Sequence, residues 1–219
     1  MLTRIIYGEK LEKLKIELIS MGSLVEQSIV KATRAFVKKD IALADQVIKD
    51  DEKINEKEGN IENECVRLLA TEQPVAGDLR LIISILNMIR DLERIGDYAA
   101  HLAQTTSELT SAETGFEADF SNITDLSVLM IKDTFRAFAT QNVDLAREIR
   151  ERDGLVDSFY LLLFKKILQN ISEDPKRQEE GFHLLFVVKY LERLADHIVN
   201  LCEEIEYMCT GSRKDSGIH

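Results

Sequence analysis

The 219-residue sequence is short of the residues that interrupt helices, with only two prolines and ten glycines, and it has no tryptophan. Leu, Ile, Ala, Glu and Lys dominate instead, and most of these residues favour the helical state. The composition therefore predicts an all-α fold.

Cysteine is also scarce, with Cys65, Cys202 and Cys209 as the only three, and none of them stands in a CxxC pair. An odd number of thiols at such spacing supports neither a disulfide framework nor a zinc ribbon. We expect reduced, buried thiols in a cytoplasmic protein.

Long apolar runs are missing as well. The first ten residues (MLTRIIYGEK) lack the apolar core of a signal peptide, and no later stretch approaches the roughly 18 apolar residues that cross a bilayer. The sequence therefore predicts a protein that is neither exported nor inserted in a membrane.

Positive charge is in the minority. Lys and Arg total 28 against 39 Asp and Glu, so the formal net charge is −11. Such a chain repels a phosphate backbone, which argues against non-specific nucleic-acid binding.

Apolar residues do recur every three or four positions, as expected for amphipathic helices. The periodic segments predict helices at 11–37, 41–71, 74–109, 124–140, 142–171 and 175–210. Pro74 and Pro175 would each open the third helix of a unit, since proline is tolerated in a first turn.

The six segments form two repeats. Residues 34–36 (RAF) recur 102 positions later at 136–138, and residues 92–97 (LERIGD) recur 99 positions later at 191–196 (LERLAD). Tandem duplication explains this likeness better than chance. Since a lone amphipathic helix is marginal in water, we expect two tandem three-helix bundles, at 1–112 and 113–219, with the boundary in the polar segment 110–122.

Each predicted bundle carries two pairs of polar oxygens on its second and third helices. Residues four apart share a helix face, so the members of each pair are neighbours. The pairs are Asp51 with Asn55, Glu93 with Asp97, Asp153 with Asp157, and Glu192 with Asp196. If the two faces meet, each bundle offers four oxygen donors of the hard type that Mg²⁺, Mn²⁺, Ca²⁺ or iron prefers.

Ordinary ion pairs along the helices are the alternative explanation of these carboxylates. On spacing alone, Arg94 could pair with Asp91 and Asp97, and Lys189 with Glu192. No histidine recurs at matching positions of both repeats, which argues against a zinc site of the usual kind.

Residues 73–80 (QPVAGDLR) followed by 91–97 (DLERIGD) resemble the signature of the PhoU family, and 190–197 (YLERLADH) resembles its second copy. The resemblance covers nearly the whole chain. It implies a cytoplasmic regulator, not an enzyme, that restrains phosphate uptake and the phosphate-starvation response. Such a protein couples the ATPase subunit of the phosphate transporter to a sensor histidine kinase at the inner membrane face, and homodimers are implied too.

The family's E(D)xxxD motifs bind multinuclear metal clusters, and they match Glu93 to Asp97, Asp153 to Asp157 and Glu192 to Asp196. The resemblance thus implies metal ions as cofactors, with iron, zinc, manganese and magnesium as candidates. At Asp51 to Asn55 the last position is an amide, so we expect the first site to bind metal less tightly than the second.

Two other readings remain open. Glu180 and His183 form one ExxH spacing, as in ferritin-like di-iron bundles, although that chemistry uses two such motifs. A helical adaptor without metal would leave the acid pairs as solvated faces. No P-loop, GxGxxG or GxSxG motif is present, and we expect His101 and His197 to be exposed helix residues rather than catalytic bases.

Overall fold

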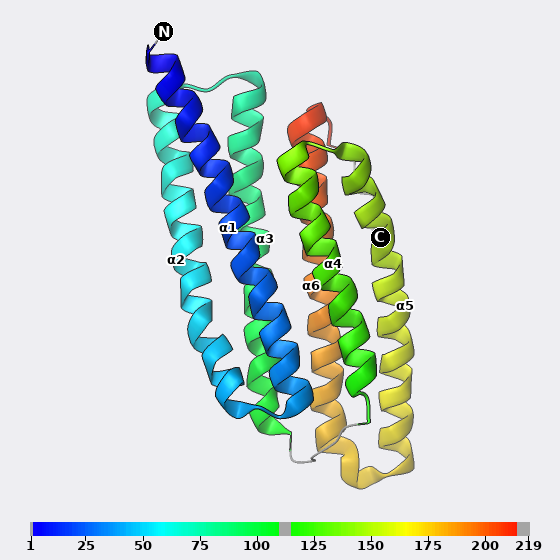
Figure 1. The fold of residues 1–219 in the computed structure, drawn as a ribbon. Coiled ribbons are helices and arrows are strands. Elements are labelled where there is room, and N and C mark those ends of the chain that lie inside the picture. Colours follow the sequence, from blue (N-terminus) through cyan, green and yellow to red (C-terminus); the bar gives the residue numbers. More distant parts are fainter. Residues whose placement is uncertain (1, 110–114, 214–219) are drawn as a thin grey trace.

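A computed structural model describes residues 2–109 and 115–213 and shows six long α-helices (Figure 1). The helices are α1 (Leu2–Lys38), α2 (Ile41–Glu72), α3 (Ala76–Glu108), α4 (Glu117–Thr140), α5 (Val143–Glu173) and α6 (Gln178–Thr210), and the short 3₁₀ turn η1 (Pro175–Arg177) precedes α6. No strand occurs in the described part of the chain. The predicted all-α fold of two three-helix repeats is confirmed.

Some helix limits differ from the expected ones. α1 begins at Leu2 rather than at residue 11, and α4 begins at Glu117, inside the predicted loop 110–122. Glu117 and Asp119 lie in the first turn of α4, where carboxylates favour a helix start. Residues 110–114 of the expected boundary lie outside the described residues, and the division at 112/113 stays a prediction.

The first-turn position expected for Pro74 is wrong, because α3 begins two residues later. Gln73 before it has a left-handed backbone (φ 47°), and Val75 after it is extended. Proline disfavours a right-handed helical conformation in the residue that precedes it, which keeps α2 and α3 apart here. Pro175 matches its expectation more closely, since it opens the η1 turn that leads into α6.

The first connection of each bundle is the same turn. Lys39 (φ 54°) and Gln141 (φ 52°), which are 102 residues apart, both adopt a left-handed conformation. In the next residue, the side chain of Asp40 accepts a hydrogen bond from the amide of Leu43, as the side chain of Asn142 does from that of Leu145, at 3.0 Å each. These N-caps satisfy a free amide at each helix start.

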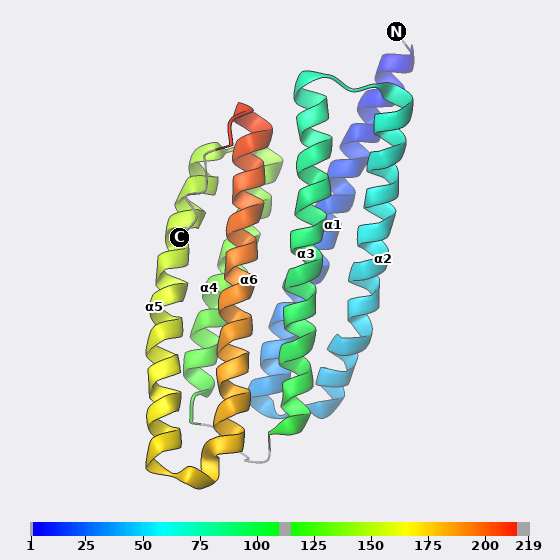
Figure 2. The same cartoon turned by 180° about the vertical axis from the view of Figure 1, so that it is seen from behind.

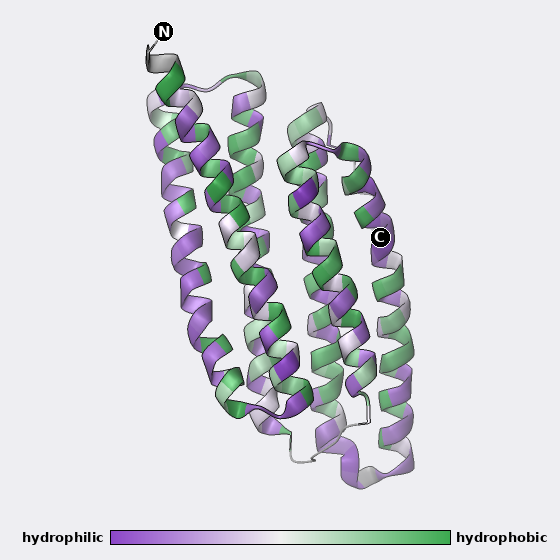
Figure 3. Ribbon diagram, in the orientation of Figure 1, coloured by the Kyte–Doolittle hydropathy of each residue, from purple (hydrophilic) through white to green (hydrophobic). Residues whose placement is uncertain are grey.

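Helices α1, α2 and α3 form one bundle and α4, α5 and α6 the other (Figure 1). The bundles pack side by side through α3 against α6, as seen from behind in Figure 2, and through α1 against α4. Green apolar and purple polar residues alternate along each helix in Figure 3, as amphipathic helices require. The buried residues form one hydrophobic cluster that includes all six helices. Cys65 and Cys202 are buried free thiols, as predicted, and Cys209 is partly buried.

The contacts between bundles obey a pseudo-two-fold relation. Thr33 of α1 and Thr124 of α4 share a buried hydrogen bond of 2.9 Å. Shifting each residue to its equivalent in the other repeat gives Phe135 and Gly22, which are also in contact. A Cβ atom added at Gly22 would lie 2.0 Å from Cε2 of Phe135, so the close approach of α1 and α4 needs glycine there.

One ion pair recurs with reversed polarity. Lys31 of α1 binds Asp50 of α2 at 3.3 Å, and 102 residues later Asp133 of α4 binds Arg152 of α5. Since the geometry is kept while the charges are exchanged, the repeats preserve the contact rather than the residue types. None of the described helices has an apolar segment long enough to cross a bilayer.

Candidate metal centres

The first set of predicted site residues lies where α2 faces α3. Asp51 is partly buried, and a Cβ atom added at Gly96 of α3 would come within 3.2 Å of its Oδ1 atom. Asn55 is exposed and donates a hydrogen bond of 3.4 Å to Oδ2 of Asp51. Burial and the nearby charge of Asp97 raise the pKa of Asp51, and the same two causes raise the pKa of Glu93. The structure therefore brings all four predicted residues into one region.

The second set lies where α5 faces α6. Burial raises the pKa of Asp153 to about 6, and the neighbouring carboxylates Asp157, Asp196 and Glu192 add to the rise. The pKa of Asp196 is also raised, by burial and then by Glu192. Crowded carboxylates repel one another, and each raised pKa means that the negative charge is poorly compensated.

Basic side chains provide part of the compensation, as the ion-pair explanation predicted. Arg94 lies 3.6 Å from Glu93 and 3.4 Å from Asp97. Lys189 contacts Glu192 at 2.6 Å, and Arg193 contacts Asp196 at 3.3 Å. These pairs join residues of one helix, so they do not neutralise Asp51 or Asp153 on the facing helix.

The donor sets fit hard cations in chemistry. Oδ1 of Asp51 is buried without a hydrogen-bond partner among the described residues, and a lone buried carboxylate oxygen is costly unless a cation meets it. Among these same residues, no three acidic, histidine or cysteine side chains stand close enough to enclose one ion. Metal binding at the two sites stays a prediction, and it requires the carboxylates to turn inward together.

A row of aromatic and histidine side chains, which we call the seam, joins α3 to α6 between the two sites. Tyr98 stacks on Tyr190 with ring centroids 6.0 Å apart. Nδ1 of His197 lies 2.7 Å from Oδ1 of Asp91, and the His197 side chain is 21% exposed, so the expectation that His197 is an exposed residue was wrong. His101 is exposed as expected, and its ring lies 5.4 Å from that of Tyr190.

Sequence reasoning missed the seam, although one signal was present. Asp91 and Tyr190 are equivalent positions, and so are Tyr98 and His197, 99 residues apart in each case. The contact of Asp91 with His197 is thus the pseudo-symmetric counterpart of the contact of Tyr190 with Tyr98. Helices α3 and α6 each contribute one residue to each contact. The two candidate sites lie on either side of this pair of helices, one where α2 faces α3 and the other where α5 faces α6.

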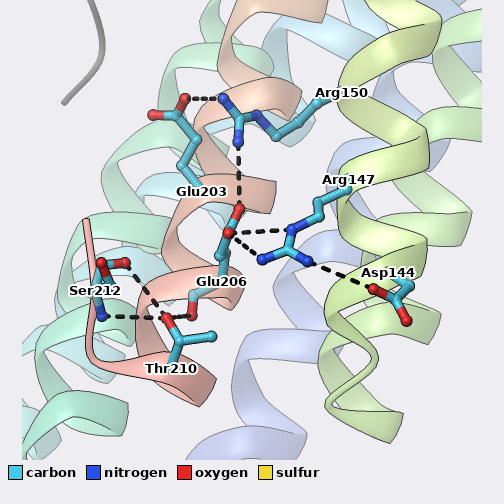
Figure 4. A network of polar contacts seen from close by, with 7 residues as sticks. All are labelled: Asp144, Arg147, Arg150, Glu203, Glu206, Thr210 and Ser212. Carbon is cyan, nitrogen blue, oxygen red and sulfur yellow. Dashed lines mark hydrogen bonds and ion pairs between the residues drawn. The ribbon is translucent and has the colours of Figure 1, made fainter. Parts of the chain in front are cut away.

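An ion-pair network fastens α5 to α6 at the end of the second bundle (Figure 4). Glu206 is only 6% exposed and receives Arg147 at 2.6 Å and Arg150 at 3.3 Å. Arg150 also contacts Glu203 at 2.9 Å. The network fixes the spacing of the two helices that carry the second set of carboxylates.

The single ExxH motif does not build a di-iron site. Glu180 is buried, whereas Nδ1 of His183 lies 3.0 Å from a carboxylate oxygen of Glu108 on α3. His183 is thus engaged at the seam side of α6, and the ferritin-like reading gains no support from the arrangement.

Both repeats of the chain match the same known domain. A sequence model described as the PhoU domain matches the chain twice, at residues 18–106 and 120–205. The phosphate-specific transport system accessory protein PhoU homolog of Clostridium acetobutylicum is 38% identical over 216 residues, which cover 98% of this chain and 99% of that protein. The homolog of Pseudomonas putida is 36% identical over 94% of this chain and 81% of its own length.

Solved structures agree. The crystal structure of the phosphate transport system regulatory protein PhoU from Streptococcus pneumoniae has a TM-score of 0.90 at 33% identity, covering 95% of this chain and 99% of that one. The crystal structure of PhoU from Pseudomonas aeruginosa has a TM-score of 0.88 at 35% identity, with coverages of 94% and 100%. Sequence, repeat and fold agree along almost the entire length, and the chain therefore belongs to the PhoU family.

Proposed function

We propose that this protein regulates phosphate transport and restrains both phosphate uptake and the phosphate-starvation response. The support is its family: full-length relatives are named accessory proteins of the phosphate-specific transport system, and one solved relative is named its regulatory protein. The protein acts by binding, as a cytoplasmic adaptor between the transporter's ATPase subunit and a sensor histidine kinase.

The observation that carries the mechanism is the pair of acidic sites flanking the seam. Burial, and then neighbouring carboxylates on the same and the facing helix, raise the pKa values of Asp51, Asp153 and Asp196. A helix surface can dock a partner without catalysis, and its charge decides which partners are attracted.

Metal ions would be held by Asp51, Asn55, Glu93 and Asp97 in the first site. In the second they would be held by Asp153, Asp157, Glu192 and Asp196. A bound cation supplies positive charge that offsets these carboxylates. Asp51 and Asp153 bring charge from the second helix of each bundle, and the third helices bring the rest. A bound metal would thereby make the surface beside the seam less negative.

An adaptor that works without metal is the second candidate. The ion pairs of Arg94, Lys189 and Arg193 favour it, because they already supply cations to both third helices. The two candidates predict different metal contents for a variant from which an acidic pair has been removed.

Metal analysis of protein purified without chelator separates them. The variant Glu192→Gln with Asp196→Asn should lose metal, whereas Asn55→Ala should lose little because it leaves every carboxylate in place. The matched control is Glu52→Gln with Glu56→Gln, which removes an exposed pair of the same spacing on α2. An unchanged metal content in the Glu192 and Asp196 variant would favour the adaptor without metal.

The pathway is tested in cells from which the gene is deleted. In the deletion strain, phosphate uptake and the activity of a phosphate-starvation reporter should both rise at high external phosphate. The wild-type gene should restore both to their original levels. The Glu192 and Asp196 variant should restore them poorly and bind the ATPase subunit and the kinase less tightly than the control does. Normal uptake and reporter activity in the deletion strain would contradict the proposed function.

A further inference from the structure

Helix α5 carries an exposed apolar row that the second bundle does not use. Leu155 is 54% exposed, Phe159 39% and Leu162 51%, and we call these three residues the α5 stripe. Leu129 of α4, 50% exposed, lies beside it, because α4 and α5 run antiparallel and Asp133 pairs with Arg152 one turn away. Contiguous exposed apolar side chains usually mark an interaction surface.

The first bundle shows that the fold does not require apolar residues there. The positions 102 residues earlier are polar in every case, namely Gln27, Lys53, Lys57 and Asn60. Lys57 forms an ion pair with Glu17 of α1. Both bundles pack in the same way, so the apolar character of the α5 stripe serves something other than the packing of its own bundle.

We propose that the α5 stripe binds the α5 stripe of a second copy of this chain, with the two helices antiparallel about a two-fold axis. Residues along this face follow one another in steps of three or four, the spacing of a coiled-coil seam. They are Glu148, Glu151, Leu155, Phe159, Leu162 and Lys166. With the axis between Ser158 and Phe159, Leu155 lies opposite Leu162 of the other copy, and the Phe159 rings meet near the axis.

Charge complementarity selects a second copy as the occupant. The row is acidic before the apolar residues and basic after them, so the antiparallel arrangement places Glu151 opposite Lys166 of the other copy twice. Glu151 is exposed, and the side chain of Lys166 is 43% exposed. Lys166 already contacts Asp119 of α4 at 3.0 Å, but its ammonium group has three N–H donors and can donate to a further carboxylate.

The interface leaves the acidic sites free. Asp153 and Asp157 face α6, whereas Arg152 and Lys166 beside the stripe face α4. Resemblance to the family implied a homodimer without naming a face. The present inference names the face and stands independently of the proposed role in phosphate transport.

Sedimentation equilibrium of charge variants at low salt tests the arrangement. Glu151→Lys and Lys166→Glu should each raise the dissociation constant of the dimer by roughly tenfold or more, because each places like charges opposite one another at two points. An equimolar mixture of the two variants should form a heterodimer of near wild-type affinity, since the two residues of each facing pair then carry opposite charges again. A parallel arrangement would not be weakened by either single variant.

Apolar variants provide the second measurement. Leu155→Lys and Phe159→Lys introduce the residue types that the first bundle has at these positions, so the fold should be kept and the dimer lost. Val66→Lys, which removes a side chain 55% exposed on α2, is the matched control and should leave the dimer intact. A wild-type protein that stays monomeric up to about 100 μM, above the Kd of even a modest interface, would overturn the proposal. A dimer that these variants do not affect would also overturn it, because that dimer would form through another face of the molecule.

Discussion

Replacing Asp153 with Asn should stabilise the metal-free protein at alkaline pH. The carboxyl group of Asp153 has its pKa raised from 3.8 to about 6 by burial and by the carboxylates of Asp157, Asp196 and Glu192. In the unfolded chain it ionises near the ordinary value. The folded protein therefore binds the proton more tightly, and stability from this group is full below about pH 4 and lost as the pH rises through about 6.

The magnitude follows from the size of the rise. For a fully shielded group, a pKa change from 3.8 to about 6 corresponds to about 3 kcal/mol. Asp153 is only partly buried, and screening by water reduces the expected effect to about 1 kcal/mol. In a chain of this length that is a rise of about 2–4 °C in Tm.

Unfolding is followed by circular dichroism in urea, with chelator present, from pH 4 to pH 8. Asp153→Asn should be the more stable protein at pH 8, and the difference should shrink towards zero at pH 4. Asp45→Asn, which removes an exposed carboxylate near the start of α2, is the control for the loss of one negative charge. With Mn²⁺ in place of chelator the order should reverse, because a ligand that binds only the folded state stabilises it and the variant has lost a donor. A variant less stable than wild type at pH 8 in chelator would refute the electrostatic reasoning.

Three further predictions concern packing and ion pairs. Gly22→Ala should destabilise the protein by about 1–2 kcal/mol in urea unfolding, because its methyl group collides with Phe135, whereas Gly59→Ala, with open space around it, should stabilise it by up to about 1 kcal/mol. Glu206→Gln should cost about 1–2 kcal/mol by the same assay, since it removes the buried counter-charge of Arg147 and Arg150 and leaves them only the more exposed carboxylates of Asp144 and Glu203; an unchanged midpoint would show that Glu206 adds nothing to stability. Asp133→Lys combined with Arg152→Asp copies the polarity of the first bundle, so the double variant should be more stable than either single variant; additive losses would contradict a direct pair.

The helices and their pairing within each bundle were predictable because burial imposes a period on the sequence. Where a helix extends past the core, that period disappears. Ile5 and Ile6 are 55% and 45% exposed, and the first turns of α1 were therefore not recognised. The meeting of Asp51 with Glu93 and Asp97 was predictable for the same reason, since each lies at the edge of an apolar face that must turn towards its neighbour.

The contact between bundles was not predictable from either bundle alone. His197 lies on a polar edge of α6 and looks exposed until α3 of the other repeat brings Asp91 to it. Periodicity shows which side of a helix is buried. It does not show whether the polar edge of α6 is covered by a helix of its own bundle or by a helix of the other bundle. Side-chain direction is equally hidden, as Asn55 and Asp157 show: both belong to the predicted sites, and both remain exposed.

The pseudo-two-fold packing of the repeats has a consequence for evolution and assembly. Two identical subunits related by symmetry must change together, since one gene encodes both, whereas two halves of one polypeptide are released from that constraint. Here the inner contacts recur in both repeats while the outer helices have diverged, with Lys53 and Lys57 on α2 at the positions where α5 has Leu155 and Phe159. A molecule with two unlike flanks on one rigid frame is suited to hold one protein on each flank at a fixed separation.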